Sequence, residues 1–396
     1  QAQLTSASTQ TLTGTLQSIG STTTNLINIP TLTITGGTLD IDHDLTLTNT
    51  GQVLQLNAAS SVDIATSQSF TVDGGAINWD GGSLGGTGSL VQANSATLDI
   101  GVITDGGTLT LAGLTIGLTD PVLENNTDLI INSGQLDVTG TLLINTAAEL
   151  FMNGGTLSLT TGGVGSTQQI TLNNGRLTST GGAITGTGSN GLIQIDNVAG
   201  SALTLNSGTL TLTDVDITNA QSLVMSDGSS LILTNDGTLT NNATGTLSMN
   251  GDVTLDQSGV GPFQLVNSGT ITKASGSGTS VIDVAVNNSN AMTHSAGTLD
   301  LQRGLVQTAG SLTTAAGSTL QTSSLQLGGG SITANGALSV SGSFTWNGAA
   351  DINGNGLGNL DLGGSTTVSG AGDHNLVNLT VNQSGTLTLN STAGNL

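Results

Sequence analysis

The sequence predicts an all-β fold, a parallel β-helix (β-solenoid) that forms a single elongated rod of roughly 15–20 coils. Three observations support this prediction. A short phrase, Gly-Thr-Leu-x-Leu, recurs along the chain, 60 of the 396 residues are glycine, and only 7% of the residues are charged. Because a helix needs long polar side chains on its solvated face, so low a charged fraction leads us to expect almost no helix.

Each copy of the phrase is a turn residue followed by alternating apolar and polar residues, the pattern of a short strand with one buried face. The copies begin at Gly37, Gly107, Gly134, Gly155, Gly208, Gly297 and Gly385, and relaxed forms contain Gly175, Gly237 and Gly269. From the second copy to the sixth, successive glycines lie 20 to 33 residues apart, with a mean of about 27. This spacing matches one β-helix coil of about 20–30 residues with corners of variable length.

The aliphatic residues of each phrase are candidates for the core. We expect pairs such as Leu39 and Ile41, or Leu109 and Leu111, to point inward and to stack on their counterparts about 4.8 Å away in the next coil. Outward threonines and asparagines then form the solvated face. Residues 1–25 are rich in Ser, Thr and Gln and lack the phrase, which predicts a cap, a pairing arm or a frayed end. Residues 26–396 are predicted to form one continuous β-solenoid.

A longer glycine-rich phrase marks predicted corners. Residues 81–88 (Gly-Gly-Ser-Leu-Gly-Gly-Thr-Gly) match residues 181–188, and a looser copy covers residues 347–356. The two tryptophans of the chain precede the first and third copies. Because glycine permits positive φ, we predict tight bends formed by these positions: Trp79, Gly81, Gly82, Gly181, Gly182, Trp346 and Gly348.

The glycine-rich phrases and the Trp-[Asn/Asp]-Gly corners resemble the repeats of bacterial haemagglutinin-like adhesins, autotransporter passengers and other very large surface proteins. The resemblance extends over nearly the whole chain as a texture of repeats. It implies a right-handed coil and an extracellular bacterial setting. The chain departs from the autotransporter pattern because it lacks a C-terminal run of aromatic-rich alternating strands.

The charge of the chain excludes several classes of partner. The net charge is −22, with only Arg176, Lys273 and Arg303 as cations. Binding of nucleic acids or anionic membranes requires clustered basic residues, and no apolar run reaches the length of a membrane-spanning helix. We therefore expect no nucleic-acid partner and no membrane insertion. The absence of cysteine removes disulfides, thiolate metal sites and cysteine nucleophiles.

Catalytic residues are scarce in the sequence. Some parallel β-helix families cleave polysaccharides, and Asn126-Thr127-Asp128 matches one piece of a polygalacturonase signature, but the remaining elements are missing. The histidines, His43, His294 and His374, are far apart in sequence, and tyrosine is absent. General acid and base catalysis needs clustered groups. We predict no catalytic residues, no cofactor and no enzymatic activity, with a polysaccharide-active enzyme as a third alternative.

Two ligand-binding alternatives rest on the spacing of polar residues. Asp40, Asp42 and Asp44 alternate, so a strand through them would place three carboxylates on one face as oxygen ligands for calcium. A solvated strand face explains the same pattern. Repeated Thr-x-Thr pairs, such as Thr209 and Thr211, resemble ice-binding surfaces, although threonine is also the best polar strand former.

The sequence as a whole favours a structural protein. The chain begins without methionine or an apolar leader, which is compatible with a signal peptide already cleaved and an extracellular or cell-surface location. No charged capping helix follows the last phrase, and open ends of β-helices recruit further strands. We therefore expect a secreted, non-enzymatic fibre subunit that associates head to tail with copies of itself, or an adhesin stalk in a biofilm matrix. The alternative is an adhesin or passenger segment whose side loops bind host or glycan ligands.

Overall fold

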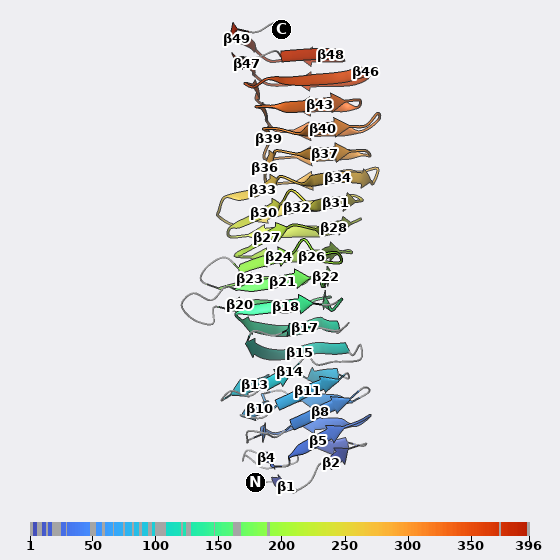
Figure 1. Ribbon diagram of the computed structural model, residues 1–396, viewed down its shortest axis with the longest axis vertical. Coiled ribbons are helices and arrows are strands. Elements are labelled where there is room, and N and C mark those ends of the chain that lie inside the picture. The colour runs from blue at the N-terminus through green and yellow to red at the C-terminus, as the bar shows by residue number, and fades with distance from the viewer. Residues whose placement is uncertain are drawn as a thin grey trace. The chain divides into compact units, whose positions relative to one another are not determined.

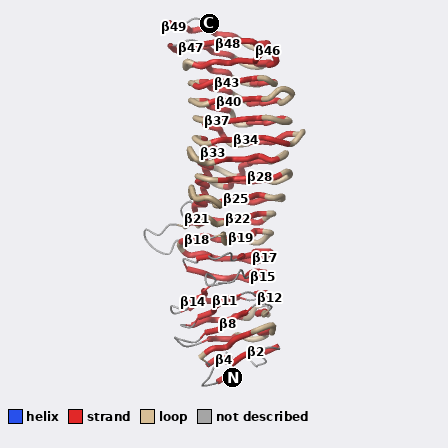
Figure 2. The backbone as a smooth tube through the Cα atoms, turned by 45° about the vertical axis from the view of Figure 1, so that its right-hand side comes forward, coloured by secondary structure: helices blue, strands red, loops and turns tan. Residues whose placement is uncertain are grey.

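The computed structural model is all-β. The residues that it describes form the strands β1–β49 and no helix, and Figure 2 draws their backbone as strands connected by loops. The described residues are 3–5, 10–12, 15–17, 25–28, 30–47, 53–57, 60–65, 67–73, 76–80, 83–86, 89–93, 97–99, 108–119, 122–123, 128–145, 147–160, 168–187, 191–371 and 374–393. The chain divides into two compact units. Unit 1 comprises residues 1–193 with 198–202, and unit 2 comprises residues 194–197 with 203–396.

Each unit is a parallel β-solenoid whose turns contribute one strand to each of three faces (Figure 1). We number the faces in the order in which the chain crosses them. Strands of one face pair in parallel with the strands of the same face one turn before and one turn after. Because every backbone group within a strand thereby finds a partner in a neighbouring turn, short strands suffice to build each face.

In unit 2 the faces are made of the following strands. Face 1 holds β26 (Thr209–Thr213), β29 (Ser230–Thr234), β32 (Thr254–Ser258), β35 (Thr279–Ile282), β38 (Thr298–Leu301), β41 (Thr319–Thr322), β44 (Ala337–Val340) and the second halves of β46 (Ala350–Leu362) and β48 (His374–Gln383). Face 2 holds β27 (Val215–Asn219), β30 (Gly237–Asn241), β33 (Phe263–Asn267), β36 (Ala285–Asn288), β39 (Leu305–Gln307), β42 (Leu325–Leu327), β45 (Phe344–Trp346), β47 (Thr366–Ala371) and β49 (Leu387–Ala393). Face 3 holds β28 (Ser222–Ser226), β31 (Thr246–Asn250), β34 (Thr270–Ser275), β37 (Ala291–His294), β40 (Ser311–Thr314), β43 (Gly330–Ala334) and the first halves of β46 and β48.

Unit 1 repeats the same arrangement. Its face 1 holds β1 (Gln3–Thr5), β4 (Asn25–Asn28), β7 (Leu45–Leu47), β10 (Ser69–Asp73), β13 (Ser89–Ala93), the second halves of β15 (Thr108–Thr119) and β17 (Asp128–Thr139), β20 (Thr156–Thr160) and β23 (Gly182–Gly186). Its face 2 holds β2 (Gln10–Leu12), β5 (Thr31–Ile34), β8 (Val53–Asn57), β11 (Ala76–Asp80), β14 (Thr97–Asp99), β16 (Val122–Leu123), β18 (Thr141–Asn145), β21 (Gln169–Asn173) and β24 (Gly191–Ile195). Its face 3 holds β3 (Thr15–Gln17), β6 (Thr38–Ile41), β9 (Ser61–Ile64), β12 (Ser83–Gly86), the first halves of β15 and β17, β19 (Glu149–Met152) and β22 (Arg176–Ser179), while β25 (Ala202–Leu205) contains residues of both units.

The core consists of aliphatic ladders that run from turn to turn. Side chains alternate between buried and partly exposed along most strands, as the period of two requires. In face 1 of unit 2, Leu210 is in register with Leu231 and Leu231 with Leu255, and all three are at most 2% exposed. Residues of similar size that stack in register fill the interior closely. Each fully buried leucine contributes roughly 2 kcal/mol to the free energy of folding.

The predicted fold class is confirmed. The described chain is all-β, and its strands are parallel and stack as a β-solenoid. Leu39 and Ile41 are buried as expected, whereas the side chains of Leu109 and Leu111 lie outside the described residues. Within residues 1–25, β1, β2 and β3 pair in parallel with β4, β5 and β6, so described parts of this lead form solenoid strands. Its role as a cap or pairing arm and the right hand of the coil stay predictions.

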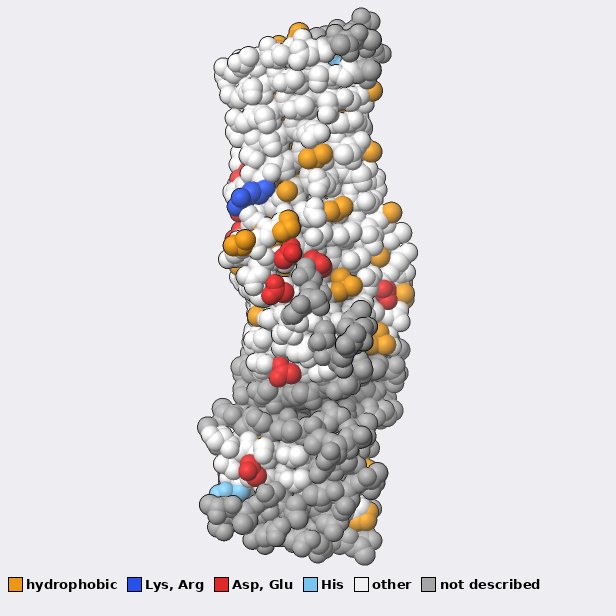
Figure 3. All heavy atoms as spheres, turned by 90° about the vertical axis from the view of Figure 1, so that its left-hand side faces the viewer, with side chains coloured by type: hydrophobic (Ala, Val, Ile, Leu, Met, Phe, Trp, Pro, Cys, Tyr) orange, Lys and Arg blue, Asp and Glu red, His pale blue; other side chains and the backbone are white. Residues whose placement is uncertain are grey.

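On the face drawn in Figure 3, most described atoms belong to the backbone or to side chains that are neither hydrophobic nor charged, with separate acidic side chains among them. This matches a composition in which Ser, Thr and Asn cover the solvated faces. In the described part of the chain, no helix has the length and hydrophobicity needed to cross a membrane.

Candidate functional site

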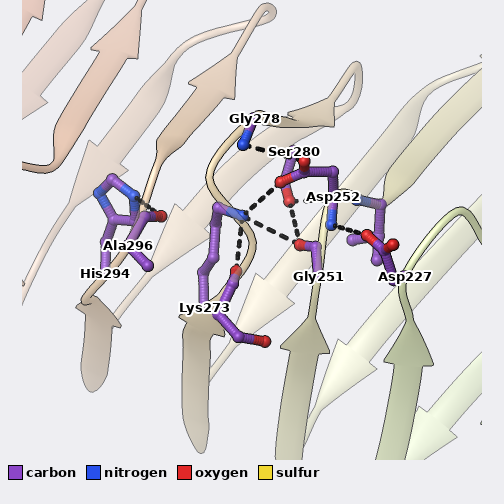
Figure 4. Close-up of polar contacts among 10 residues, drawn as sticks. Asp227, Gly251, Asp252, Lys273, Gly278, Ser280, His294 and Ala296 are labelled. Atoms are coloured by element: carbon purple, nitrogen blue, oxygen red, sulfur yellow. Dashed lines mark hydrogen bonds and ion pairs between the residues drawn. The ribbon is translucent and has the colours of Figure 1, made fainter.

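The most unusual side chain in the described core is the fully buried lysine of face 3. Lys273, near the end of β34, has 0% exposure, and its Nζ donates to the carbonyl oxygens of Gly251 (2.9 Å) and Ser275 (3.0 Å) (Figure 4). Its third partner is the carboxylate of Asp252, with 3.3 Å between Nζ and Oδ1. All three ammonium donors are therefore satisfied, which is the condition under which a buried charge is tolerated.

Hydrogen bonds in the corner that contains Asp252 hold the partners of this ammonium in place. The other carboxylate oxygen of Asp252 accepts a hydrogen bond from the backbone N–H of Gly278 at 2.9 Å. The backbone N–H of Asp252 donates to Asp227 in the turn before it, at 2.8 Å. Ser280 donates to the same Gly251 carbonyl at 3.0 Å. The network thus connects three successive corners of unit 2 (Figure 4).

His294 occupies the next position after Lys273 in the same inward row. The two residues are in register between β34 and β37, and His294 is also 0% exposed. Its Nε2 lies 2.8 Å from the carbonyl oxygen of Ala296, and its Nδ1 has no partner. Burial lowers the pKa of His294 below its ordinary value, with a smaller contribution from the charge of Lys273, and hydrogen bonding to the backbone of Ala296 and Gly297 offsets only part of this shift.

A column of buried amides runs through the last position of face 2. Each amide nitrogen donates to the amide oxygen one turn later, over 2.8 Å from Asn219 to Asn241, 2.6 Å from Asn241 to Asn267, 2.5 Å from Asn267 to Asn288 and 2.7 Å from Asn288 to Gln307. All five residues are 0% exposed. The column continues in register into Leu327 and Trp346, where apolar packing replaces hydrogen bonding. In unit 1, Asn173 donates to Asn145 of the turn before it at 3.0 Å, in the opposite direction along the chain.

The last turn of unit 2 leaves part of the ladder uncovered. Leu376, Val381 and Leu389 are in register with the buried Ile352, Leu360 and Val368, yet they are 42–51% exposed. Leu387 is 53% exposed. The pairings of β48 and β49 in the described residues are with β46 and β47. This turn therefore presents apolar inward positions and strand edges together.

The predicted calcium ligands do not share one strand face. Asp40 lies on β6, which ends at Ile41, so Asp42 and Asp44 lie in the following corner. The carboxylate of Asp44 accepts hydrogen bonds from the backbone N–H and hydroxyl of Ser69, at 2.8 and 2.9 Å. Partial burial and then the charges of Asp42 and Asp63 raise the pKa of Asp40. No group of three or more metal-binding side chains is found among the described residues.

We expect calcium to leave stability unchanged, because the Asp44 carboxylate is already engaged by Ser69 and the three acids do not converge. Thermal unfolding in millimolar calcium and in excess chelator checks this prediction. The two curves should coincide. A rise in melting temperature with calcium that Asp40→Asn abolishes would show that a site forms.

The predicted corner residues occupy different kinds of position. Gly182 begins β23 with a φ of +112°, and a Cβ there would lie 3.0 Å from the carbonyl oxygen of Gly155. Gly348 lies in a bend where a Cβ would meet the carbonyl oxygen of Gly328 at 1.8 Å. Trp346, by contrast, ends β45 and is 1% exposed, so it belongs to the core rather than to the bend. Trp79 lies on β11, and Gly81 and Gly82 are outside the described residues.

The three glycine phrases mark two kinds of corner. The first and third fall between strands of face 2 and face 3, β11 and β12 in unit 1 and β45 and β46 in unit 2, whereas the second falls between β22 on face 3 and β23 on face 1. Similar local sequences therefore serve different bends, because the requirement at each is only close backbone approach or positive φ. The histidines are also separated: His43 belongs to unit 1, while His294 and His374 belong to unit 2 on β37 and β48.

A shallow hollow lies on the outside of face 2 in unit 2. Its volume is about 170 Å³, and its lining includes Asn287, Arg303, Val306, Gln326 and Thr345. Arg303 donates to the carboxylate of Asp283 at 2.7 Å, and this bond and the charge of Asp283 raise the pKa of Arg303. The hollow offers neutral polar groups beside one paired cation.

Comparison of the chain with protein-family models, with curated proteins and with solved structures finds no match in any of the three.

Proposed function

We propose that this chain is a secreted, non-enzymatic structural β-solenoid of the bacterial surface or extracellular matrix, which extends by joining end to end with copies of itself. The observation that carries the proposal is the exposed ladder of the last turn. Leu376, Val381 and Leu389 are in register with Ile352, Leu360 and Val368 of the preceding turn, which are buried. A further turn placed on them would remove their surface from water and pair the edges of β48 and β49.

The first strands of the chain are suited to provide that turn. On the three faces these are β1, β2 and β3, and their pairings in the described residues are with the following turn, in parallel. Each of these strands has a second edge, opposite the one that pairs with the following turn. In a parallel solenoid, the strands at this edge and the strands of the last turn have the same chain direction. End-to-end contact would therefore extend the sheets with the geometry that they already have.

The distribution of charge favours contact at these ends. The chain carries a net charge of −22, yet residues 1–39 and residues 374–396 contain no Asp, Glu, Lys or Arg. Two strongly acidic molecules repel each other, and the repulsion is greatest where like charges meet at close range. Contact between uncharged ends avoids that cost. Side-by-side contact, by contrast, brings the acidic faces together.

Negative-stain microscopy and sedimentation velocity test the proposal on the purified chain. We expect filaments of even width that lengthen with protein concentration. Leu389→Asp places a carboxylate on the exposed ladder, where the next turn would bury it, and should abolish the filaments while leaving the circular dichroism spectrum unchanged. Val260→Asp is the matched control, because Val260 is 90% exposed and lies in a corner far from the last turn. Isolated particles of the wild-type chain at all concentrations, or filaments of undiminished length from Leu389→Asp, would refute end-to-end joining.

The hollow on face 2 favours a second candidate, an adhesin segment whose sides bind host or glycan ligands. Neutral polar side chains such as Asn287, Gln326 and Thr345 beside Arg303 offer hydrogen-bond partners for sugar hydroxyls. This alternative predicts isolated particles in the microscope. Binding of a soluble glycan that Asn287→Ala and Gln326→Ala weaken would favour it over the structural function.

A further inference from the structure

Face 3 of unit 2 contains two basic side chains that are stacked inside the core in adjacent turns. One inward row near the ends of the face-3 strands runs in register through five successive turns and is at most 1% exposed: Met225, Met249, Lys273, His294 and Thr314. The first two members are thioethers that pack without polar demands. Lys273 and His294 therefore interrupt an otherwise neutral row.

The hydrogen bond of His294 fixes the position of its proton. A carbonyl oxygen can only accept, so Nε2 must donate to Ala296 at 2.8 Å. The neutral ring then carries its lone pair on Nδ1, which is buried and without a partner. A proton added at Nδ1 would create a buried N–H with no acceptor, next to an ammonium that is also buried.

The charged groups around this ring do not compensate for a second positive charge. From β34, the group that acts on His294 is the Lys273 ammonium. The Asp252 carboxylate, from the corner after β31, already pairs with that ammonium. From β40 the residue in register is the neutral Thr314. A protonated His294 would thus face repulsion from Lys273 and no acid of its own.

We propose that the turns of β34 and β37 are an acid-sensitive point in unit 2, at which the solenoid opens locally when His294 takes up a proton at Nδ1. Opening lets water solvate the imidazolium ring and separates it from the Lys273 ammonium. This property is independent of end-to-end joining, because it resides in internal turns and concerns their stability alone.

The direction of the pH dependence follows from proton linkage. The pKa of His294 is below its ordinary value of 6.5 in the folded chain, so the opened form binds the proton more tightly. The stability of the closed form relative to the opened form is highest above pH 6.5 and decreases as the pH falls below 6.5. The equilibrium between closed and opened forms changes by up to tenfold per pH unit until the pH reaches the folded-state pKa.

Hydrogen exchange with mass spectrometry on the full chain tests the proposal between pH 7.5 and pH 5, after correction for the intrinsic rates. We expect protection in peptides over β34, β37 and β40 to fall by up to tenfold per pH unit below 6.5. Peptides over β26 to β29 should change less. In His294→Met, which extends the natural methionine row, the local pH dependence should disappear. His43→Gln is the matched control, since it removes a histidine from unit 1 and should behave as the wild type.

A second measurement on the wild-type chain covers the case in which His294→Met fails to fold. Exchange at the imidazole C2 position reports the pKa of each histidine, and His294 should titrate below pH 6.5. Lys273→Met removes the neighbouring charge and should raise that pKa and reduce the local pH dependence. Protection over β34 and β37 that is independent of pH, an undiminished dependence in His294→Met, or titration of His294 at or above pH 6.5 would each overturn the proposal.

Discussion

Replacing Asn241 with alanine is expected to lower the free energy of unfolding of the surrounding turns by about 2–4 kcal/mol. Asn241 lies inside the amide column, where it accepts from Asn219 and donates to Asn267. Alanine removes these bonds and also the one from Asn241 to the carbonyl oxygen of Thr270, and it leaves one N–H of Asn219 and the amide oxygen of Asn267 buried without partners. Each such group costs about 1–3 kcal/mol. Urea unfolding combined with hydrogen exchange over β27 to β33 measures the loss and its location.

Thr240→Ala is the matched control for this experiment. Thr240 precedes Asn241 on β30 but points outward, so its replacement should change stability by less than about 0.5 kcal/mol. The loss in Asn241→Ala should also be confined to the adjoining turns, because a solenoid turn contacts only its neighbours. Equal effects of the two substitutions would show that the column contributes nothing beyond strand packing.

Replacing Asp252 with alanine is expected to cost about 2–3 kcal/mol, because it leaves the Lys273 ammonium buried without its counter-charge. Removal of one partner from a fully buried ion pair costs about 3–5 kcal/mol. We expect less because the Asp252 side chain is 36% exposed and partly solvated, whereas that of Lys273 is 0% exposed. The substitution also removes the acceptor of the Gly278 N–H. Thermal and urea unfolding of the variant measure the loss.

The double variant Asp252→Ala with Lys273→Met separates charge burial from lost packing. Methionine at position 273 extends the row of Met225 and Met249, so the double variant buries no charge and should recover most of the stability. Asp300→Ala, which removes an acid from the outside of face 1, should change stability by less than about 0.5 kcal/mol. A double variant less stable than Asp252→Ala alone would contradict this explanation.

The fold could be predicted because the strand pattern is local. Alternation in phrases such as residues 208–212 specifies which side chains point inward, and the returning glycines specify that the strands stack turn upon turn. The spacing of the glycines does not, however, reveal how many strands each turn contains. Each turn holds three strands, and copies of the phrase fall on all three faces, as at β20 on face 1, β30 on face 2 and β22 on face 3, so the return of the phrase does not mark one face of the solenoid.

The polar interior could not be predicted in the same way. Lys273 and His294 look like ordinary polar residues at the ends of strands, and only the register of β34 and β37 reveals that both are inward. The amide column did leave a signal, because Asn219, Asn241 and Asn267 each follow an alternating apolar pair at the end of a strand. Asp42 and Asp44 show the opposite case. Their alternation suggested a strand, but the chain turns after Ile41.

The side-chain contacts between turns of unit 2 join residues that are close in sequence, and this affects how the chain folds. The side-chain bonds between turns connect residues 17 to 29 positions apart, as from Thr366 to Gln383 and from Ser280 to Gly251. A finished turn therefore already presents the complete template for the next one: strand edges, an apolar ladder and free amide groups. Folding can proceed by growth from any completed turn, without waiting for the far end of the chain. A growing tip of this kind has the same surface chemistry as the exposed last turn, so elongation within one molecule and joining between molecules would be one physical process.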